Sequence, residues 1–208
     1  MLRLLTLLFV LAAAPTWAAG LFGTLEIKGN SIASFTKWVD VLGRIRAQSG
    51  ILQNCYDNPG SCTAPGTRKW EAMMVRAQGQ GAERQLDMVN SFFNDSPYIE
   101  DINNYGKSDY WATPLQFMKN SGDCEDYAIA KFVSLRMLGW NNDDLRVVIL
   151  KDTVRQVNHA VLAAKLGGDD MILDNLATEP LPSDTVIQYS PYYAVNETSR
   201  WIFIKPAQ

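Results

Sequence analysis

Residues 121–139 read SGDCEDYAIAKFVSLRMLG, and the hydrophobic pattern of the chain changes at this stretch. From Cys124 onward, apolar residues recur at helical spacing until Gly139, which is typical of a helix that ends at a glycine. These apolar residues are Ala128, Ile129, Phe132, Leu135 and Leu138. We therefore predict a helix that begins near Cys124 and ends near Gly139.

After Gly139 the hydrophobic period shortens to two residues, which predicts β-strands. Short runs rich in β-branched and aromatic residues alternate with turn residues, as they do in antiparallel sheets. The expected strands are residues 145–150, 159–166, 171–175, 185–189 and 200–205.

The part of the chain before Cys124 predicts helices and loops. Amphipathic patterns indicate helices, the first of them behind the capping residue Ser31, and clusters of Pro, Gly, Asn and Asp indicate loops. Helices followed by strands indicate an α+β fold with Cys124 at the junction. The expected helices cover residues 32–45, 68–77 and a stretch after Gly81, and the expected loops cover residues 51–66 and 94–114.

The composition fits one globular domain. The 208 residues are 47% hydrophobic, and no repeat, linker or low-complexity tract interrupts them, so we expect a single domain over residues 19–208. Nineteen basic and 22 acidic residues are interspersed without a basic run, so electrostatic capture of nucleic acid has no visible basis. One His and three Cys would all be needed for a single zinc site with four ligands.

Residues 1–18 have the pattern of a secretory signal peptide. One Arg precedes an apolar run from Leu4 to Ala14, and small residues follow at Thr16 and Ala18. The run is shorter than the roughly 20 residues that a membrane-spanning helix needs. We therefore expect cleavage after Ala18 and export of the remaining chain, with a membrane-retained signal as the alternative.

Cys55 and Cys62 enclose the sequence YDNPGS, which has a turn signal at its centre. In an exported protein this pattern favours a disulfide. Two reduced, partly buried thiols are the alternative. A zinc pair is disfavoured because six intervening residues exceed the two to four residues of common zinc motifs.

Cys124 is then an unpaired cysteine at the start of a helix. The free N–H groups and the positive dipole end of a helix start favour the thiolate, which is the nucleophilic form of cysteine. The same N–H groups can bind the oxyanion of a tetrahedral intermediate. These features predict a nucleophile, whereas burial as a small apolar residue is the common alternative.

His159 is the only available histidine and so the candidate general base. Gly167 and Gly168 separate two strand-like runs and predict a hairpin with a two-residue turn. In that register Asp174 is the diagonal neighbour of His159 on the same face, close enough for the two side chains to interact. The prediction is a nucleophile, base and orienting group formed by Cys124, His159 and Asp174. A turn longer by one residue would put Asn175 in the place of Asp174.

Three carboxylates flank the candidate nucleophile, namely Asp123, Glu125 and Asp126. Negative charges disfavour the thiolate, so a compensating cation is one interpretation. Asp123 and Asp126 lie three residues apart and can face one oxygen-lined site for a hard divalent ion. The alternative is helix capping by Asp123, with Glu125 and Asp126 favoured by the helix dipole.

Three segments resemble a known family. GDCEDYA at 122–128, NHAVL at 158–162 and LDN at 173–175 resemble the bacterial transglutaminase-like cysteine proteases, in particular the LapG-type periplasmic enzymes. The resemblance extends over most of the chain after residue 18. It implies a papain-like transglutaminase core and a triad of Cys124, His159 and Asp174. It also implies that acidic neighbours of the nucleophile bind calcium, which here would be Asp123, Glu125 and Asp126.

The resemblance further implies a substrate, a partner and a location. The substrate is the N-terminal region of a large cell-surface adhesin, cut at a pair of alanines, so that the adhesin is released and the biofilm disperses. The partner is an inner-membrane cyclic-di-GMP receptor that sequesters the protease in the periplasm. A transglutaminase-type acyltransferase and a non-catalytic binding module on the same fold are the alternative functions. Independently of the resemblance, Trp111 is a candidate for lining a cleft or supplying an oxyanion donor, together with Tyr105 and Tyr110 in the same loop, and packing is the alternative.

Overall fold

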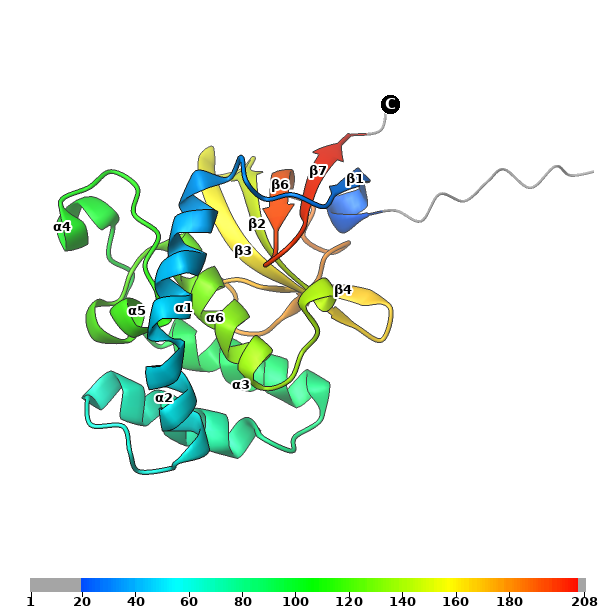
Figure 1. Cartoon of the computed structure of the whole chain (residues 1–208). Helices are drawn as coiled ribbons and strands as arrows, with labels where there is room; N and C mark the ends of the chain where they lie inside the picture. Colours follow the sequence, from blue (N-terminus) through cyan, green and yellow to red (C-terminus); the bar gives the residue numbers. More distant parts are fainter. Residues whose placement is uncertain (1–19, 206–208) are drawn as a thin grey trace, which may run out of the picture.

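The computed structural model describes residues 20–205. The signal peptide expected over residues 1–18 lies outside the described residues. Within the described part, no helix is both long enough and apolar enough to cross a membrane. The fold is α+β, as predicted, with helices gathered on one side of an antiparallel sheet (Figure 1).

The helices occupy mainly the first two thirds of the chain. Helix α6 starts at Cys124, as the sequence predicts, and packs against strands β2 and β3. Helices α3 and α5 pack on α6 in turn, which places α6 between the sheet and the outer helices (Figure 1). The helices are α1 (Thr36–Asp57), α2 (Pro65–Ala77), α3 (Ala82–Asn94), α4 (Asp101–Tyr105), α5 (Pro114–Asn120) and α6 (Cys124–Met137), with 3-10 turns at Leu21–Gly23 and Asn142–Asp144.

A seven-stranded sheet has the order β1-β7-β6-β2-β3-β4-β5, and all neighbouring strands are antiparallel. The N-terminal strand β1 therefore pairs with the C-terminal strand β7 at one edge of the sheet. The strands are β1 (Leu25–Gly29), β2 (Leu145–Asp152), β3 (Val157–Leu166), β4 (Asp169–Leu173), β5 (Leu181–Pro182), β6 (Tyr189–Val195) and β7 (Arg200–Ile204).

The sheet has hydrophobic residues on both faces. Alternate residues of β3 belong to two separate clusters, because successive side chains of a strand point to opposite faces. Leu162 packs with the helices and with Trp38, whereas Val161 packs with Leu21 and Trp201 on the other face. The central strands are thus buried on both sides, which fixes the position of the residues at their ends.

The β3–β4 hairpin has the register that the sequence predicts. Leu166 pairs with Asp169 across Gly167 and Gly168, and the pairing continues to Leu162 opposite Leu173. Both glycines have positive φ values, 63° and 120°, which side chains disfavour. The hairpin therefore ends with Asp174 directly after β4.

Several expected boundaries were wrong. Helix α1 starts at Thr36 without a side-chain cap and continues to Asp57, so the loop expected over 51–66 is much shorter. The strand expected over 185–189 is mostly turn, and the strand begins only at Tyr189. The loop expected over 94–114 contains helix α4. Strands β1 and β5 and helix α5 were not predicted.

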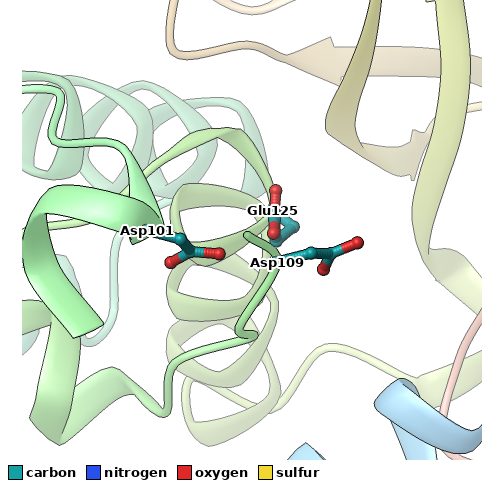
Figure 2. Close-up of side chains that lie close together, drawn as sticks. All are labelled: Asp101, Asp109 and Glu125. Atoms are coloured by element: carbon teal, nitrogen blue, oxygen red, sulfur yellow. The ribbon is translucent and has the colours of Figure 1, made fainter. Parts of the chain in front are cut away.

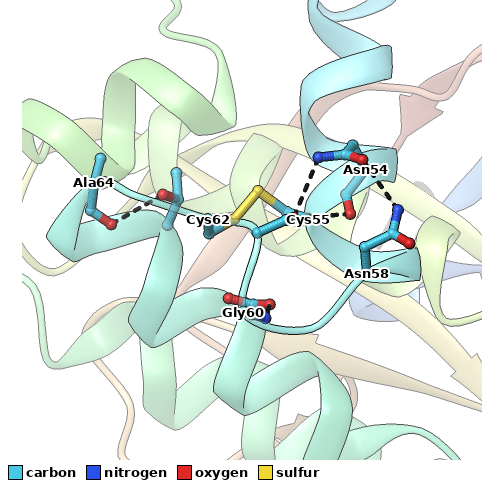
Figure 3. Close-up of a disulfide and its surroundings, with 9 residues drawn as sticks. Asn54, Cys55, Asn58, Gly60, Cys62 and Ala64 are labelled. Carbon is cyan, nitrogen blue, oxygen red and sulfur yellow. Dashed lines mark hydrogen bonds between the residues drawn. A yellow bond between two sulfur atoms is a disulfide. The ribbon is translucent and has the colours of Figure 1, made fainter.

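The disulfide between Cys55 and Cys62 is present, as predicted (Figure 3). Cys55 lies in the last turns of α1 and Cys62 in the short loop before α2, with their Cα atoms 5.2 Å apart. Both cysteines are buried in the core between the helices. The bridge therefore fixes the connection between α1 and α2.

Candidate active site

Cys124 is the first residue of α6, and it is partly exposed and free of any disulfide. The chain enters this helix through a tight turn after α5, in which Ser121 has a φ of 60°. This conformation is uncommon for residues other than Gly, and it brings the loop sharply into the helix. The first N–H groups of a helix have no intrahelical acceptor. The N–H of Asp126 already donates to the carbonyl of Asp123, so the groups available beside the thiol are those of Cys124 and Glu125.

The thiol of Cys124 lies between acidic side chains and strand β3. Its Sγ atom donates a hydrogen bond to Oε2 of Glu125 at 3.3 Å. Burial, and then the charges of Glu125 and Asp123, raise the pKa of the thiol well above its ordinary value. A hydrogen bond from the backbone N–H of Ala160 lowers the pKa of the thiol and so opposes these effects. The sulfur therefore lies close to the residue that follows His159.

His159 and Asp174 form a buried hydrogen-bonded pair. Nε2 of His159 lies 2.8 Å from Oδ1 of Asp174, and both side chains are about 95% buried. Within residues 20–205 no hydrogen bond joins Cys124 to His159, and the thiol donates to Glu125 instead. Nδ1 of His159 is the ring nitrogen that Asp174 leaves available. The structure therefore places Asp174, and not Asn175, against His159.

The Asp174 carboxylate is held by three hydrogen-bond donors. Oδ1 accepts hydrogen bonds from His159 and from the N–H of Leu176 at 3.0 Å, and Oδ2 accepts one from the hydroxyl of Tyr189. Burial alone would raise the pKa of Asp174, but these hydrogen bonds and the His159 charge outweigh it and lower the pKa below its ordinary value. Asp174 is thus kept ionised, as an orienting carboxylate requires.

The backbone of Asp174 is anchored to the helical layer. Nδ2 of Asn94 donates to the Asp174 carbonyl oxygen at 2.8 Å. A second chain of hydrogen bonds starts at Lys131 of α6, which is fully buried. Its Nζ donates to Oδ1 of Asn90 at 2.8 Å, and Nδ2 of Asn90 donates to the carbonyl oxygen of Ala177. Burial lowers the pKa of Lys131 to about 7, and the negative charge of Asp174 opposes this shift. A buried polar network therefore connects the nucleophile helix to the Asp174 loop.

The acidic residues around Cys124 do not cap the helix. Asp123 occupies the N-cap position, but its side chain makes no capping hydrogen bond. Its Oδ2 atom instead accepts a hydrogen bond from the N–H of Asp101 at 3.3 Å. Asp126 is fully buried and turns back to accept a hydrogen bond from the N–H of Ala112 at 2.6 Å. The capping interpretation is thus wrong for Asp123.

Two further carboxylates join this acidic cluster. Oxygens of Asp101, Asp123 and Asp126 lie within 4.8 Å of one another, and oxygens of Asp101, Asp109 and Glu125 form a second such group. Figure 2 shows the second group beside the start of α6. The structure therefore brings Asp123 and Asp126 together with Asp101, and it places Glu125 in the neighbouring group.

The first of these groups has the properties of a cation site. Oδ1 of Asp101, Oδ1 of Asp123 and Oδ2 of Asp126 are buried and have no hydrogen-bond partner. Burial and neighbouring carboxylates raise the pKa of Asp126 to about 8, and burial is the largest of several effects that raise the pKa of Asp101 to about 6. Buried carboxylate oxygens without donors are costly unless a cation or proton satisfies them. Their hard oxygen donors fit a calcium ion.

Gly122 permits the position of Asp126. A Cβ atom at residue 122 would collide with the carboxylate of Asp126, which folds back over the glycine. The Asp126 side chain can therefore reach Ala112 and the acidic group only because residue 122 lacks a side chain.

The aromatic residues before the nucleophile have mainly structural contacts. Trp111 is buried in the core and packs edge-to-face on Trp38, with ring centroids 6.2 Å apart. The rings of Tyr105 and Tyr110 contact each other, and Arg44 donates a hydrogen bond to the Tyr110 hydroxyl at 3.1 Å. Packing thus accounts for their positions.

Sequence reasoning missed Asp101, Asp109 and Tyr189. Asp101 begins the short helix α4 and Asp109 lies in the loop after it, and their segment has no periodic hydrophobic pattern that would place them beside α6. Tyr189 was assigned to an expected strand, but its role at Asp174 depends on the sheet order. A surplus of acidic residues between 95 and 109 was the one available signal.

The family model of bacterial transglutaminase-like cysteine proteinases (BTLCP) matches residues 42–208. The chain therefore belongs to this family, and it is a cysteine peptidase with a transglutaminase-like fold. No curated protein matches the chain.

Solved structures of LapG from Legionella pneumophila are similar to the chain. One is 27% identical with a TM-score of 0.63, and it covers 73% of this chain and 87% of that one. The calcium-bound form has a TM-score of 0.64 at 27% identity over the same shares of the two chains. The EGTA-treated form has a TM-score of 0.64 at 26% identity, over 76% of this chain and 88% of that one. These likenesses support a protease of the LapG type.

Proposed function

We propose that the chain is a calcium-dependent cysteine endopeptidase in which Cys124, His159 and Asp174 form the catalytic triad. The observation that carries this proposal is the buried hydrogen bond between His159 and Asp174, next to a free cysteine at a helix start. A nucleophile, a base and a group that orients the base are the parts that covalent catalysis requires.

Peptide cleavage would begin with a turn of the thiol away from Glu125 toward Nδ1 of His159. The thiol proton passes to Nδ1, and Sγ of Cys124 attacks the carbonyl carbon of the scissile peptide bond. The resulting oxyanion lies next to the N–H groups of the first turn of α6, which stabilise its charge. Asp174 holds the ring in place and stabilises the imidazolium cation.

Collapse of the tetrahedral intermediate breaks the C–N bond and leaves a thioester on Cys124. His159 returns the proton to the leaving amine, so the amine departs neutral. Water then attacks the thioester carbonyl while His159 accepts its proton. The second collapse releases the carboxylic acid and restores the thiol.

Asp101, Asp123 and Asp126 would hold the calcium ion, because each has a buried oxygen without a hydrogen-bond partner and the three carboxylates lie close together. When bound there, calcium would offset the carboxylate charge beside the nucleophile and fix the loop that precedes it. The calcium-bound and EGTA-treated structures of LapG from Legionella pneumophila support the choice of metal. Glu125 and Asp109 would contribute from the neighbouring group.

The proposed biological role follows the LapG-type resemblance. The protease would act in the periplasm after removal of residues 1–18, and it would cut the N-terminal region of a large surface adhesin at a di-alanine site. Release of the adhesin would disperse the biofilm, and an inner-membrane cyclic-di-GMP receptor would sequester the protease. The match to the cysteine proteinase family and the structural likeness to LapG support this role.

The triad is tested by substitution and a fluorogenic peptide assay. Cys124→Ala and His159→Ala should each abolish cleavage, because each removes a group that forms or breaks a bond. Asp174→Asn should leave a trace of activity, since an amide orients the ring but cannot stabilise the imidazolium. Undiminished cleavage by His159→Ala would overturn the mechanism. Transfer to an added amine in preference to water would instead identify an acyltransferase.

Calcium is tested by titration calorimetry and thermal melting beside the same assay. Calcium should bind, raise the melting temperature and restore activity after chelation better than magnesium, because the irregular loop suits a flexible coordination sphere. Asp101→Asn and Asp126→Asn should lose the binding heat, while Asp184→Asn, at an exposed site, should keep it. Full activity in chelator without binding heat would contradict calcium dependence and leave the triad standing.

A further inference from the structure

A pocket of about 420 Å³ adjoins the His159–Asp174 pair. Asp174 and Tyr189 form part of its wall, and Ile172 and Val186 add buried apolar surface. Its volume lies within the range of protein pockets that bind small ligands or side chains. The pocket therefore shares residues with the active site but contains space that the proposed mechanism does not use.

Three residues that line the pocket are exposed and aliphatic. Val154 is 77% exposed, Leu176 is 53% exposed and Ile187 is 90% exposed. They come from three different loops, which connect β2 with β3, β4 with β5, and β5 with β6. One exposed aliphatic side chain needs no explanation, but three at the same pocket form an apolar surface that is typical of a binding site.

Hydrogen bonds fix the loops that carry these side chains. The N–H and hydroxyl of Thr153 donate to the carbonyl oxygen of Gln188 at 2.9 and 2.8 Å, so the β2–β3 loop is tied to the loop that holds Ile187. The N–H of Leu176 donates to Oδ1 of Asp174 at 3.0 Å. The apolar surface is therefore preorganised, and less conformational entropy is lost when it binds a partner.

The position of the pocket relative to the reacting atoms indicates which half of a substrate reaches it. The acyl half of a cleaved peptide stays on Cys124, whereas the leaving amine receives its proton from His159. The amine half therefore lies beside the imidazole ring when it departs. The pocket adjoins the far side of that ring, because its wall contains Asp174, which binds Nε2 of His159.

We infer, on the basis of the proposed peptidase function, that this pocket binds an aliphatic side chain of the substrate within the first few residues after the scissile bond. The exposed side chains of Val154, Leu176 and Ile187 would be covered by that segment. The pocket is thus a specificity-determining subsite on the leaving-group side of the active site.

The first experiment measures the preference directly. A peptide library prepared from a bacterial lysate is digested with the calcium-loaded wild-type protein, and the new N-termini are labelled and sequenced. Leu, Ile or Val should be enriched at one of the first three positions after the cut, since alanine beside the cut is already expected from the proposed di-alanine site. Cleavage without such enrichment would overturn the inference, whereas no cleavage at all would overturn the proposed function with it.

The second experiment compares two synthetic peptides that differ only in Leu or Ser at the enriched position. The double variant Val154→Ser/Ile187→Ser should lower kcat/KM about tenfold or more for the Leu peptide, since loss of apolar contacts in a pocket has effects of this size. It leaves Leu176, which is bonded to Asp174, unchanged. It should change kcat/KM less than twofold for the Ser peptide.

Two controls separate a subsite from a general defect. Ile27→Ser removes a similarly exposed aliphatic residue, 56% exposed on the edge strand β1, and should leave both peptides unaffected. Ile187→Ser alone changes one loop and should reproduce part of the selective loss even if the double variant folds poorly. Equal losses on both peptides in folded variants, or no loss on the Leu peptide, would refute the subsite.

Discussion

Replacing Tyr189 by phenylalanine removes one hydroxyl group and keeps the ring that lies beside His159, with ring centroids 5.8 Å apart. The hydroxyl donates to Oδ2 of Asp174, a carboxylate that is only 3% exposed. Among the described residues, only the Tyr189 hydroxyl donates a hydrogen bond to Oδ2 of Asp174, so the variant would leave this oxygen without a donor. A hydrogen bond to a buried charged group stabilises a protein by about 2 kcal/mol.

The loss should appear in both stability and rate. For a chain of this size, about 2 kcal/mol lowers the melting temperature by roughly 4 to 8 °C. If the imidazolium loses the same stabilisation, kcat falls by at most about thirtyfold, since about 1.4 kcal/mol is tenfold in rate. KM should stay nearly constant, because the hydroxyl is bonded to Asp174. Tyr192→Phe, on the same strand and with an exposed hydroxyl, should leave kcat within twofold.

The pH dependence supplies a second check. Because the folded pKa of Asp174 lies below 3.8, its contribution to stability is fully present above pH 3.8 and is lost as the pH falls through the folded pKa. The stability difference between wild type and Tyr189→Phe should therefore shrink in acid. A kcat within twofold of wild type, in a Tyr189→Phe protein with a lowered melting temperature, would refute the positioning role.

The other predictions concern the helical layer and the acidic cluster. Replacing both Cys55 and Cys62 by serine should lower the free energy of unfolding by about 2.5 kcal/mol, because the unfolded chain is no longer restricted by this short closed loop. Denaturant melts should show the loss, and peptide cleavage at 25 °C should be unchanged. Gly122→Ala should displace the Asp126 carboxylate and abolish the heat of calcium binding, and a normal titration would contradict this. Between pH 7 and 10.5 Lys131 is protonated in the unfolded chain but not in the folded one, so the stability of the wild type should rise with pH by up to about 1.4 kcal/mol per pH unit. Lys131→Met should remove this rise. Parallel melting curves for both proteins across that range would argue against a lysine with a lowered pKa.

The contact between His159 and Asp174 could be predicted from the sequence because local rules position both residues. A two-glycine turn sets the register of the β3–β4 hairpin, and the register sets the distance between His159 and Asp174. The start of α6 follows from the helical spacing of its apolar residues, which begins at Cys124 and is absent from the loop before it. Each of these steps involves residues that are close in the chain.

The acidic cluster depends on contacts that no local rule predicts. Asp101 reaches Asp123 from 22 residues away, through a loop whose path depends on packing around Arg44 and Trp111. The Arg44 guanidinium donates to the Trp111 carbonyl at 2.5 Å, and so helps to hold the loop against α1. A sequence pattern cannot show that such a loop folds back over a helix start.

Strand β6 was misplaced for a different physical reason. Pro191 lies inside it, and proline lacks the N–H that a central strand needs, so the pattern argues against a strand there. In the structure Pro191 pairs with Leu150 where the β2–β6 register shifts, and this irregularity accommodates the proline. The missing donor is thus tolerated at a bulge.

The pairing of β1 with β7 makes the two ends of the described chain depend on each other. Leu25 lies opposite Ile204 and Gly29 lies opposite Arg200, so this ladder joins residues more than 170 positions apart. Contacts of such separation form late, because a long loop must close before any of them can form. The amide protons of β1 should therefore be the last in the sheet to gain protection during refolding.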